Sequence, residues 1–193
     1  MNRPNNSAGF TLAETLVAVV ILVMISASAL PAAMNAYRNA VDAANAQVLL
    51  STTVNALRDE LSTAWNVSVS DDGTTIIYKS AATGDKSAIS LDNDLIMLQE
   101  YSRDETPAWW DGDSEKTTTS VRPLISDAVR RTTRNSNNFM TVKYTGAVSV
   151  VSTDGCYIKI EDLAVERNDK TLAKMPDETG LLIRVMSFES ADD

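Results

Sequence analysis

Residues 7–30 read SAGFTLAETLVAVVILVMISASAL, and this stretch decides how the chain is organised. Between residues 10 and 36 the only formal charge belongs to Glu14, whereas charged residues are spread through the chain from Tyr37 onward. A helix of residues 10–30 would be about 31 Å long, which is close to the thickness of the hydrocarbon core of a bilayer. The stretch therefore predicts a membrane-spanning helix followed by a soluble domain.

Glu14 is the unusual residue of this apolar stretch. An acidic side chain costs about 3 kcal/mol near the centre of a membrane-spanning helix and less toward the interface. Glu14 lies about one turn inside the expected helix, and no cationic side chain of the same helix lies within its reach. We therefore expect the partner of its carboxylate to come from another chain or from a newly formed amine.

The residues GFTLAE at positions 9–14 resemble the processing site of type IV prepilins and pseudopilins, as do the short polar leader before them and the unbroken apolar run after them. The resemblance implies that a prepilin peptidase cuts between Gly9 and Phe10 and methylates the new amine of Phe10. In a filament, Glu14 of an incoming subunit would pair with the Phe10 amine of a neighbour and set the register of assembly. Pro31 falls where many pilins have a helix-kinking proline.

This resemblance implies a structural subunit of a type IV pilus-like filament. The lack of a disulfide and the irregular loops favour a minor pilin or a pseudopilin over a major pilin, and of these we expect a minor pilin. The alternatives are a pseudopilin of a type II secretion or DNA-uptake system, or a membrane-anchored extracytoplasmic binding domain that does not polymerise. The implied partners are the prepilin peptidase, other pilin subunits, the cytoplasmic membrane and the assembly platform. We expect a single pass with the N-terminus inside, followed by a cell-surface or periplasmic filament.

Composition narrows the functions of the rest of the chain. The 193 residues carry 17 Lys and Arg against 26 Asp and Glu, a net charge of −9, which disfavours nucleic acid as a partner. No histidine is present, which removes Ser–His and Cys–His catalysis and histidine-ligated zinc. Cys156 is the single cysteine, so no intramolecular disulfide can form. No arrangement of residues indicates an enzyme or a cofactor.

The fold class expected is α+β, with the long N-terminal helix packed by its second half on an antiparallel β-sheet. The helix should kink at Pro31 and continue to about residue 66. Two apolar stripes follow the kink on roughly opposite faces of the helix, and we expect one to meet neighbouring helices and the other to lie on the protein's own sheet. The first stripe comprises Met34, Tyr37, Val41, Ala44 and Val48. The second comprises Leu50, Val54, Leu57, Leu61 and Trp65.

The expected organisation is a leader at residues 1–9, a membrane and assembly helix at 10–30, its continuation at 31–66 and a β-rich domain at 67–193. Alternation and β-branched residues predict strands within residues 66–80 and 87–101, two or three strands within 138–166, and a closing strand near 180–188. Residues 102–138 are less regular and form an expected loop region, with a short helix after Ser126.

Two charged clusters are weak candidates for binding sites. Asp111, Asp113 and Glu115 alternate as in a calcium loop, but the twelfth position of that loop is Arg122 rather than an acid. We therefore expect an acidic surface loop there and no bound metal. Arg130, Arg131 and Arg134 could contact nucleic acid, although the acidic chain favours the solvated face of a short helix.

Overall fold

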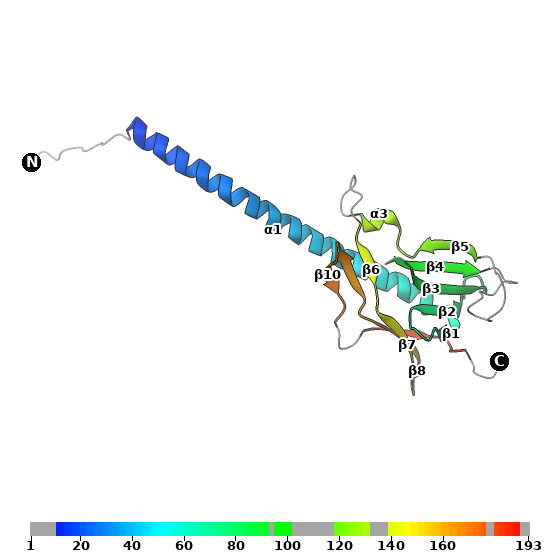
Figure 1. The fold of residues 1–193 in the computed structure, drawn as a ribbon. Helices are drawn as coiled ribbons and strands as arrows, with labels where there is room; N and C mark the ends of the chain where they lie inside the picture. The colour runs from blue at the N-terminus through cyan, green and yellow to red at the C-terminus, as the bar shows by residue number, and fades with distance from the viewer. Residues whose placement is uncertain (1–10, 93–94, 102–117, 132–138, 177–179, 190–193) are drawn as a thin grey trace, which may run out of the picture. The chain divides into compact units, whose positions relative to one another are not determined.

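The computed structural model divides into two compact units, Met1–Val41 (unit 1) and Asp42–Asp193 (unit 2) (Figure 1). One long helix, α1, contributes residues to both units, and the described strands all belong to unit 2. A long apolar N-terminal helix followed by antiparallel β-structure confirms the predicted α+β fold class. The residues described are 11–92, 95–101, 118–131, 139–176 and 180–189.

Helix α1 spans Leu12–Leu61 and passes through Pro31 as one element, and the kink at that proline stays a prediction. The helix ends earlier than residue 66, the end expected from the sequence. The amide of Ala64 donates to the carbonyl of Leu61 at 3.1 Å, and Asn66 takes a φ of +51°, a left-handed conformation that asparagine tolerates. Trp65, expected in the second stripe, is instead the first residue of strand β1. Pairing of β1 with its neighbour thus overrides the helical propensity of these residues.

The largest sheet of unit 2 is an antiparallel meander in the order β1-β2-β3-β4-β5. Its second to fourth strands pair in unbroken register, for example Ile76 with Ile89 and Ile89 with Leu98. Both faces of β2 are buried, as expected for a strand near the centre of a packed unit. The strands are β1 (Trp65–Val69), β2 (Thr75–Lys79), β3 (Lys86–Asp92), β4 (Leu95–Tyr101) and β5 (Thr118–Pro123).

Two three-stranded antiparallel sheets complete unit 2, in the orders β10-β9-β6 and β11-β8-β7. Their strands are β6 (Thr141–Lys143), β7 (Gly146–Ser152), β8 (Gly155–Glu161), β9 (Ala164–Arg167), β10 (Lys170–Lys174) and β11 (Leu181–Val185). A short helix, α3 (Asp127–Arg130), follows Ser126 as predicted. Residues 139–167 form four strands rather than the two or three expected. β5 lies within the region expected to be a loop, and β10 was not expected at all.

The core of unit 2 lies between the second part of α1 and the sheets, where Figure 1 shows the cyan part of α1 running past the strands. Leu57 and Leu61 are fully buried, and Val54 is nearly so. This burial confirms that the second apolar stripe lies on the protein's own sheets, and Ala46 and Leu49 extend it toward the N-terminus. The strands contribute, among others, Ile76, Tyr78, Ile89, Leu98, Val142, Ile158, Ile160, Val165, Leu181 and Ile183.

The segment that follows β11, residues 186–189, runs beside β1 and is called the C-terminal segment below. Val67 forms a parallel bridge with Phe188. The amide of Val67 donates to the carbonyl of Ser187, and the amide of Glu189 donates to the carbonyl of Val67, both at 3.0 Å. The C-terminal segment therefore covers the outer edge of the largest sheet and ties it to the sheet that contains β11.

Candidate functional site

The start of α1 contains a reciprocal pair of hydrogen bonds between Thr11 and Glu14. The backbone amide and the hydroxyl of Thr11 donate to Oε2 of Glu14 at 2.9 and 3.0 Å. In return, the amide of Glu14 donates to the Thr11 hydroxyl oxygen at 3.3 Å. This arrangement is a capping box, in which two side chains satisfy amides that the first turn of a helix leaves without partners. The positive end of the helix dipole also favours a carboxylate at this position.

The capping box gives Glu14 a hydrogen-bond partner within its own chain, Thr11. The charge partner expected from another chain or from a new amine stays a prediction. The signal was present in the sequence, because threonine followed by an acid three residues later is the pattern of a capping box. Oε2 of Glu14 thus accepts two hydrogen bonds from within its own chain.

The surroundings of Glu14 are apolar and open. The carboxylate lies on a surface of α1 that it shares with Ala13, Val17, Ala18 and Ile21. The small side chains of the two alanines allow another helix to approach closely, as small residues do in membrane helix packing. The most apolar part of α1 is long enough to cross a membrane, and none of it is buried inside the structure. This part of the helix therefore has no apolar cover of its own.

The first apolar stripe is also uncovered. Met34, Tyr37 and Val48 are 48%, 72% and 61% exposed, in contrast to the buried second stripe of the same helix. Leaving these large apolar side chains in water is unfavourable. Burying one side chain of this size stabilises it by about 1.5–3 kcal/mol relative to exposure. The stripe therefore indicates a surface that another element covers.

The remaining candidate residues are dispersed or lie outside the described part of the chain. Gly9 and Phe10 lie outside the described residues, and so do Asp111, Asp113 and Glu115. Among the residues that are described, no group of three or more acids or cysteines is close enough to hold a metal ion.

The arginines do not form one free basic surface in the described part of the chain. Arg122 pairs with Glu100 at 3.2 Å. Arg130 is only 7% exposed and pairs with Asp127, so it is a largely buried structural residue. Arg131 lies with its guanidinium 5.4 Å from the ring centre of Phe139, and Arg134 lies outside the described residues.

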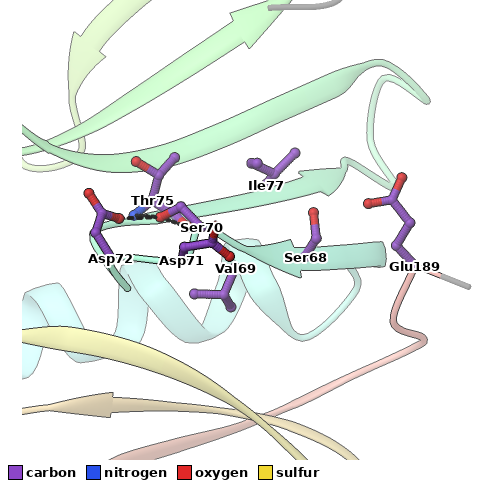
Figure 2. A pocket seen from close by; sticks show the side chains of 8 residues that line it. All are labelled: Ser68, Val69, Ser70, Asp71, Asp72, Thr75, Ile77 and Glu189. Atoms are coloured by element: carbon purple, nitrogen blue, oxygen red, sulfur yellow. Dashed lines mark hydrogen bonds between the residues drawn. The ribbon is translucent and has the colours of Figure 1, made fainter. Parts of the chain in front are cut away.

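One open pocket of about 590 Å³ lies beside the turn between β1 and β2 (Figure 2). Figure 2 shows Asp72 and Ser70 joined by hydrogen bonds, and Ser68, Ile77 and Glu189 farther along the pocket. The Ser70 hydroxyl donates to Oδ1 of Asp72 at 2.6 Å, and these bonds hold the pKa of Asp72 below its ordinary value. The bonds close the turn, as an aspartate commonly does. One end of the pocket is thus formed by turn residues already engaged with one another.

Comparison with known proteins assigns the N-terminal segment alone. Residues 4–30 match the family model described as the prokaryotic N-terminal methylation motif, and this match includes the capping box. Neither the curated proteins nor the solved structures give a significant match. The motif points to a structural protein anchored in a membrane, which fits the exposed apolar surface of α1. This segment and the long helix are similar to the N-terminal part of type IV prepilin-like proteins.

Proposed function

We propose that the chain is cleaved between Gly9 and Phe10 and then polymerises through α1 as a structural subunit of a type IV pilus-like filament. The observation that carries this proposal is a carboxylate held at the start of an uncovered apolar helix, within a matched methylation motif. Cleavage creates a positively charged amine on Phe10, one residue before the capping box. Each processed subunit then carries one cation and one anion at the same helix end.

The capping box gives the free subunit a way to keep the Glu14 carboxylate oriented. Thr11 holds Oε2 of the carboxylate toward the helix N-terminus, where the amides of the first turn stabilise its charge. When a second subunit arrives, its Phe10 amine supplies the charge partner that Thr11 lacks. Pairing two opposite charges in an apolar interface favours one axial register, because a misplaced subunit leaves both charges unpaired.

The uncovered stripe on α1 supplies the apolar part of the same contact. Met34, Tyr37 and Val48 follow the membrane part of the helix and are exposed. Helices of neighbouring subunits would cover them in the filament. We assign the chain to the minor pilins rather than to the major pilins because its single cysteine, Cys156, cannot form an internal disulfide. Its N-terminus lies on the cytoplasmic side before assembly, and it engages the peptidase, sibling pilins and the assembly platform.

The first test is the mass of the intact protein from membranes of a host that has a prepilin peptidase. We expect a chain that begins at N-methylated Phe10. A chain that keeps Met1, or one cut near Ala32, would contradict the assignment. A minor pilin should also be present in purified filaments at a small fraction of the major subunit, and equal amounts would contradict the minor role.

The second test separates the charge of Glu14 from its capping role. Glu14→Gln keeps an oxygen that accepts hydrogen bonds from Thr11 but removes the charge, so it should be processed and inserted normally yet enter filaments poorly. Breaking a buried charge pair costs about 3–5 kcal/mol, which corresponds to about 100-fold or more in the assembly equilibrium. Thr11→Val leaves the charge and removes the hydroxyl, and should reduce incorporation much less. Normal incorporation of Glu14→Gln would show that charge pairing is not used.

A further inference from the structure

The sheets of unit 2 have six outer edges, and five of them are protected against pairing with another strand. β1 is covered by the C-terminal segment. β6 has only three residues. Each of the other three has a charged residue in its strand, which discourages pairing with a foreign strand. These residues are Arg122 next to Pro123 in β5, Lys170 and Lys174 in β10, and Arg184 in β11.

The edge strand β7 lacks such protection beyond Ala147, whose amide bonds to the carbonyl of Gly73. Its sequence, GAVSVVS, contains neither a charged residue nor a proline. Its register with β8 is unbroken from Gly146 opposite Glu161 to Ser152 opposite Gly155, so no bulge twists it away. Val148 and Val151 are 49% and 76% exposed. A long, regular, uncharged and exposed edge is the form that accepts another strand.

The hydrogen bonds show which groups of β7 face outward. The amide of Ala147 donates to the carbonyl of Gly73 at 2.8 Å, away from β8. Backbone groups alternate in direction along an antiparallel strand, so those of Ser149 and Val151 also point away from β8. No described residue pairs with them on that side. In Figure 1 the far end of the β7–β8 hairpin extends beyond the other strands of unit 2, so this edge is accessible.

We propose that β7 pairs antiparallel with β7 of a second copy of this chain, centred on Val150. Ser149 then exchanges both backbone hydrogen bonds with Val151 of the second copy, and the reverse pair does the same. Val150 lies opposite its own equivalent, and Val148 lies opposite Ser152. A second copy fits because the paired stretch contains no charge, so that a chain of net charge −9 meets itself without like charges in contact. The two three-stranded sheets become one sheet of six strands.

Cysteine cross-linking of the full chain in detergent micelles tests the register. In a Cys156→Ser background, Val150→Cys places two thiols on a non-hydrogen-bonded pair, whose Cα atoms lie about 4.5 Å apart, within the range for a disulfide. Mild oxidation should convert this variant to a covalent dimer. The matched control is Val148→Cys, which faces Ser152 and should stay monomeric. Equal cross-linking of both variants, or a Val150→Cys variant that stays monomeric or links only to other proteins, would overturn the proposal.

Light scattering of the uncrosslinked full chain tests the contact without oxidation. Val150→Lys puts two like charges directly opposite each other and should reduce the particle from two chains to one, whereas Val148→Lys should leave it dimeric. Association through α1 is a separate process, so the dimer should persist in Glu14→Gln and be lost in Val150→Lys. Loss of the dimer in Glu14→Gln alone would assign it to the helix and refute the β7 contact.

Discussion

At the level of single residues, the ion pair between Asp42 and Arg167 fixes the first helical residue of unit 2 to the end of β9. The guanidinium donates to Oδ2 of Asp42, and both side chains are mostly buried. Arg167 is followed by Asn168 and Asp169, which have φ angles of +50° and +59° and turn the chain into β10. Asparagine and aspartate are the residues that tolerate this turn geometry. The pair thus anchors a hairpin to a helix 125 residues away in the sequence.

The Asp42–Arg167 pair should contribute stability that depends on pH. The hydrogen bond from Arg167 holds the pKa of Asp42 below its ordinary value, so the folded state binds fewer protons than the unfolded state. The contribution is complete above the unfolded pKa of about 3.9 and is lost as the pH falls through the lower folded pKa. A double-mutant cycle of Asp42→Asn and Arg167→Gln at neutral pH should give a coupling of about 0.5–1 kcal/mol in the free energy of unfolding.

The control for this cycle is Asp59→Asn, which removes an exposed acid from the same helix. It should leave the free energy of unfolding within about 0.5 kcal/mol of the native value. A coupling that is absent at pH 7 would show that the charge pair contributes nothing.

Glu14 and Asp42 differ in how far the sequence alone identifies their partners. Glu14 stands out because a charge within an apolar run is costly wherever its partner lies. Its partner Thr11 is less conspicuous, since a threonine at the start of a helix is common. By contrast, the partner of Asp42 cannot be read from the sequence. It depends on the chain returning to the helix after eight intervening strands, β1 to β8, with Arg167 at the end of β9.

At the level of elements, α1 has two faces with opposite roles. Leu57 is fully buried in the core of unit 2, while Val48 is 61% exposed on the first stripe. Both residues lie in the same helix, about two and a half turns apart. Substitution of each by alanine therefore separates the stability of unit 2 from assembly.

Leu57→Ala should lower the free energy of unfolding by about 2–5 kcal/mol, because it leaves a cavity under the sheets. Val48→Ala should change it by less than about 0.5 kcal/mol, because the side chain has little cover to lose. In filaments the order reverses: Val48→Ala should reduce incorporation of a fully folded subunit. Denaturant unfolding and filament fractionation measure the two effects. A Val48→Ala variant that assembles normally would remove the first stripe from the proposed contact.

The strands show why part of the fold was predicted and part was not. β2 and β11 are rich in isoleucine, leucine and valine, and their composition is sufficient to identify them. β5 (TTSVRP) and β10 (KTLAK) are short and polar, because each forms the edge of a sheet. Such strands are held by hydrogen bonds to a neighbour rather than by their own apolar residues, and that neighbour is not visible in the local sequence. The division into three sheets also depends on which strands pair, and the local sequence does not show this pairing.

At the level of the whole molecule, the C-terminal segment joins the sheets of unit 2. Besides its bonds to Val67, the amide of Met186 donates to the carbonyl of Ala64 at 2.9 Å, and Phe188 packs against the core. A chain that ends at Val185 should therefore be less stable than one that ends at Glu189. Each backbone hydrogen bond contributes about 0.5–1.5 kcal/mol, so three of them predict a loss of about 1.5–4.5 kcal/mol before the packing of Phe188 is counted.

Thermal or denaturant unfolding of the two shortened chains measures this difference. The chain that ends at Glu189 serves as the control, since it lacks only residues 190–193. The shorter chain should also aggregate more readily, because the edge of β1 is then open. Equal stability of the two chains would show that the C-terminal segment does not contribute to the free energy of unfolding.

The position of the C-terminal segment has a consequence for the order of events during synthesis. Asn66 and Ser187, which are hydrogen-bonded, lie 121 residues apart. A ribosome releases β1 well before residues 186–189, so the edge of β1 stays open while β2 to β11 are made. Contacts between such distant residues are also slow to form. Closure of the β1 edge is therefore a late event in the folding of unit 2.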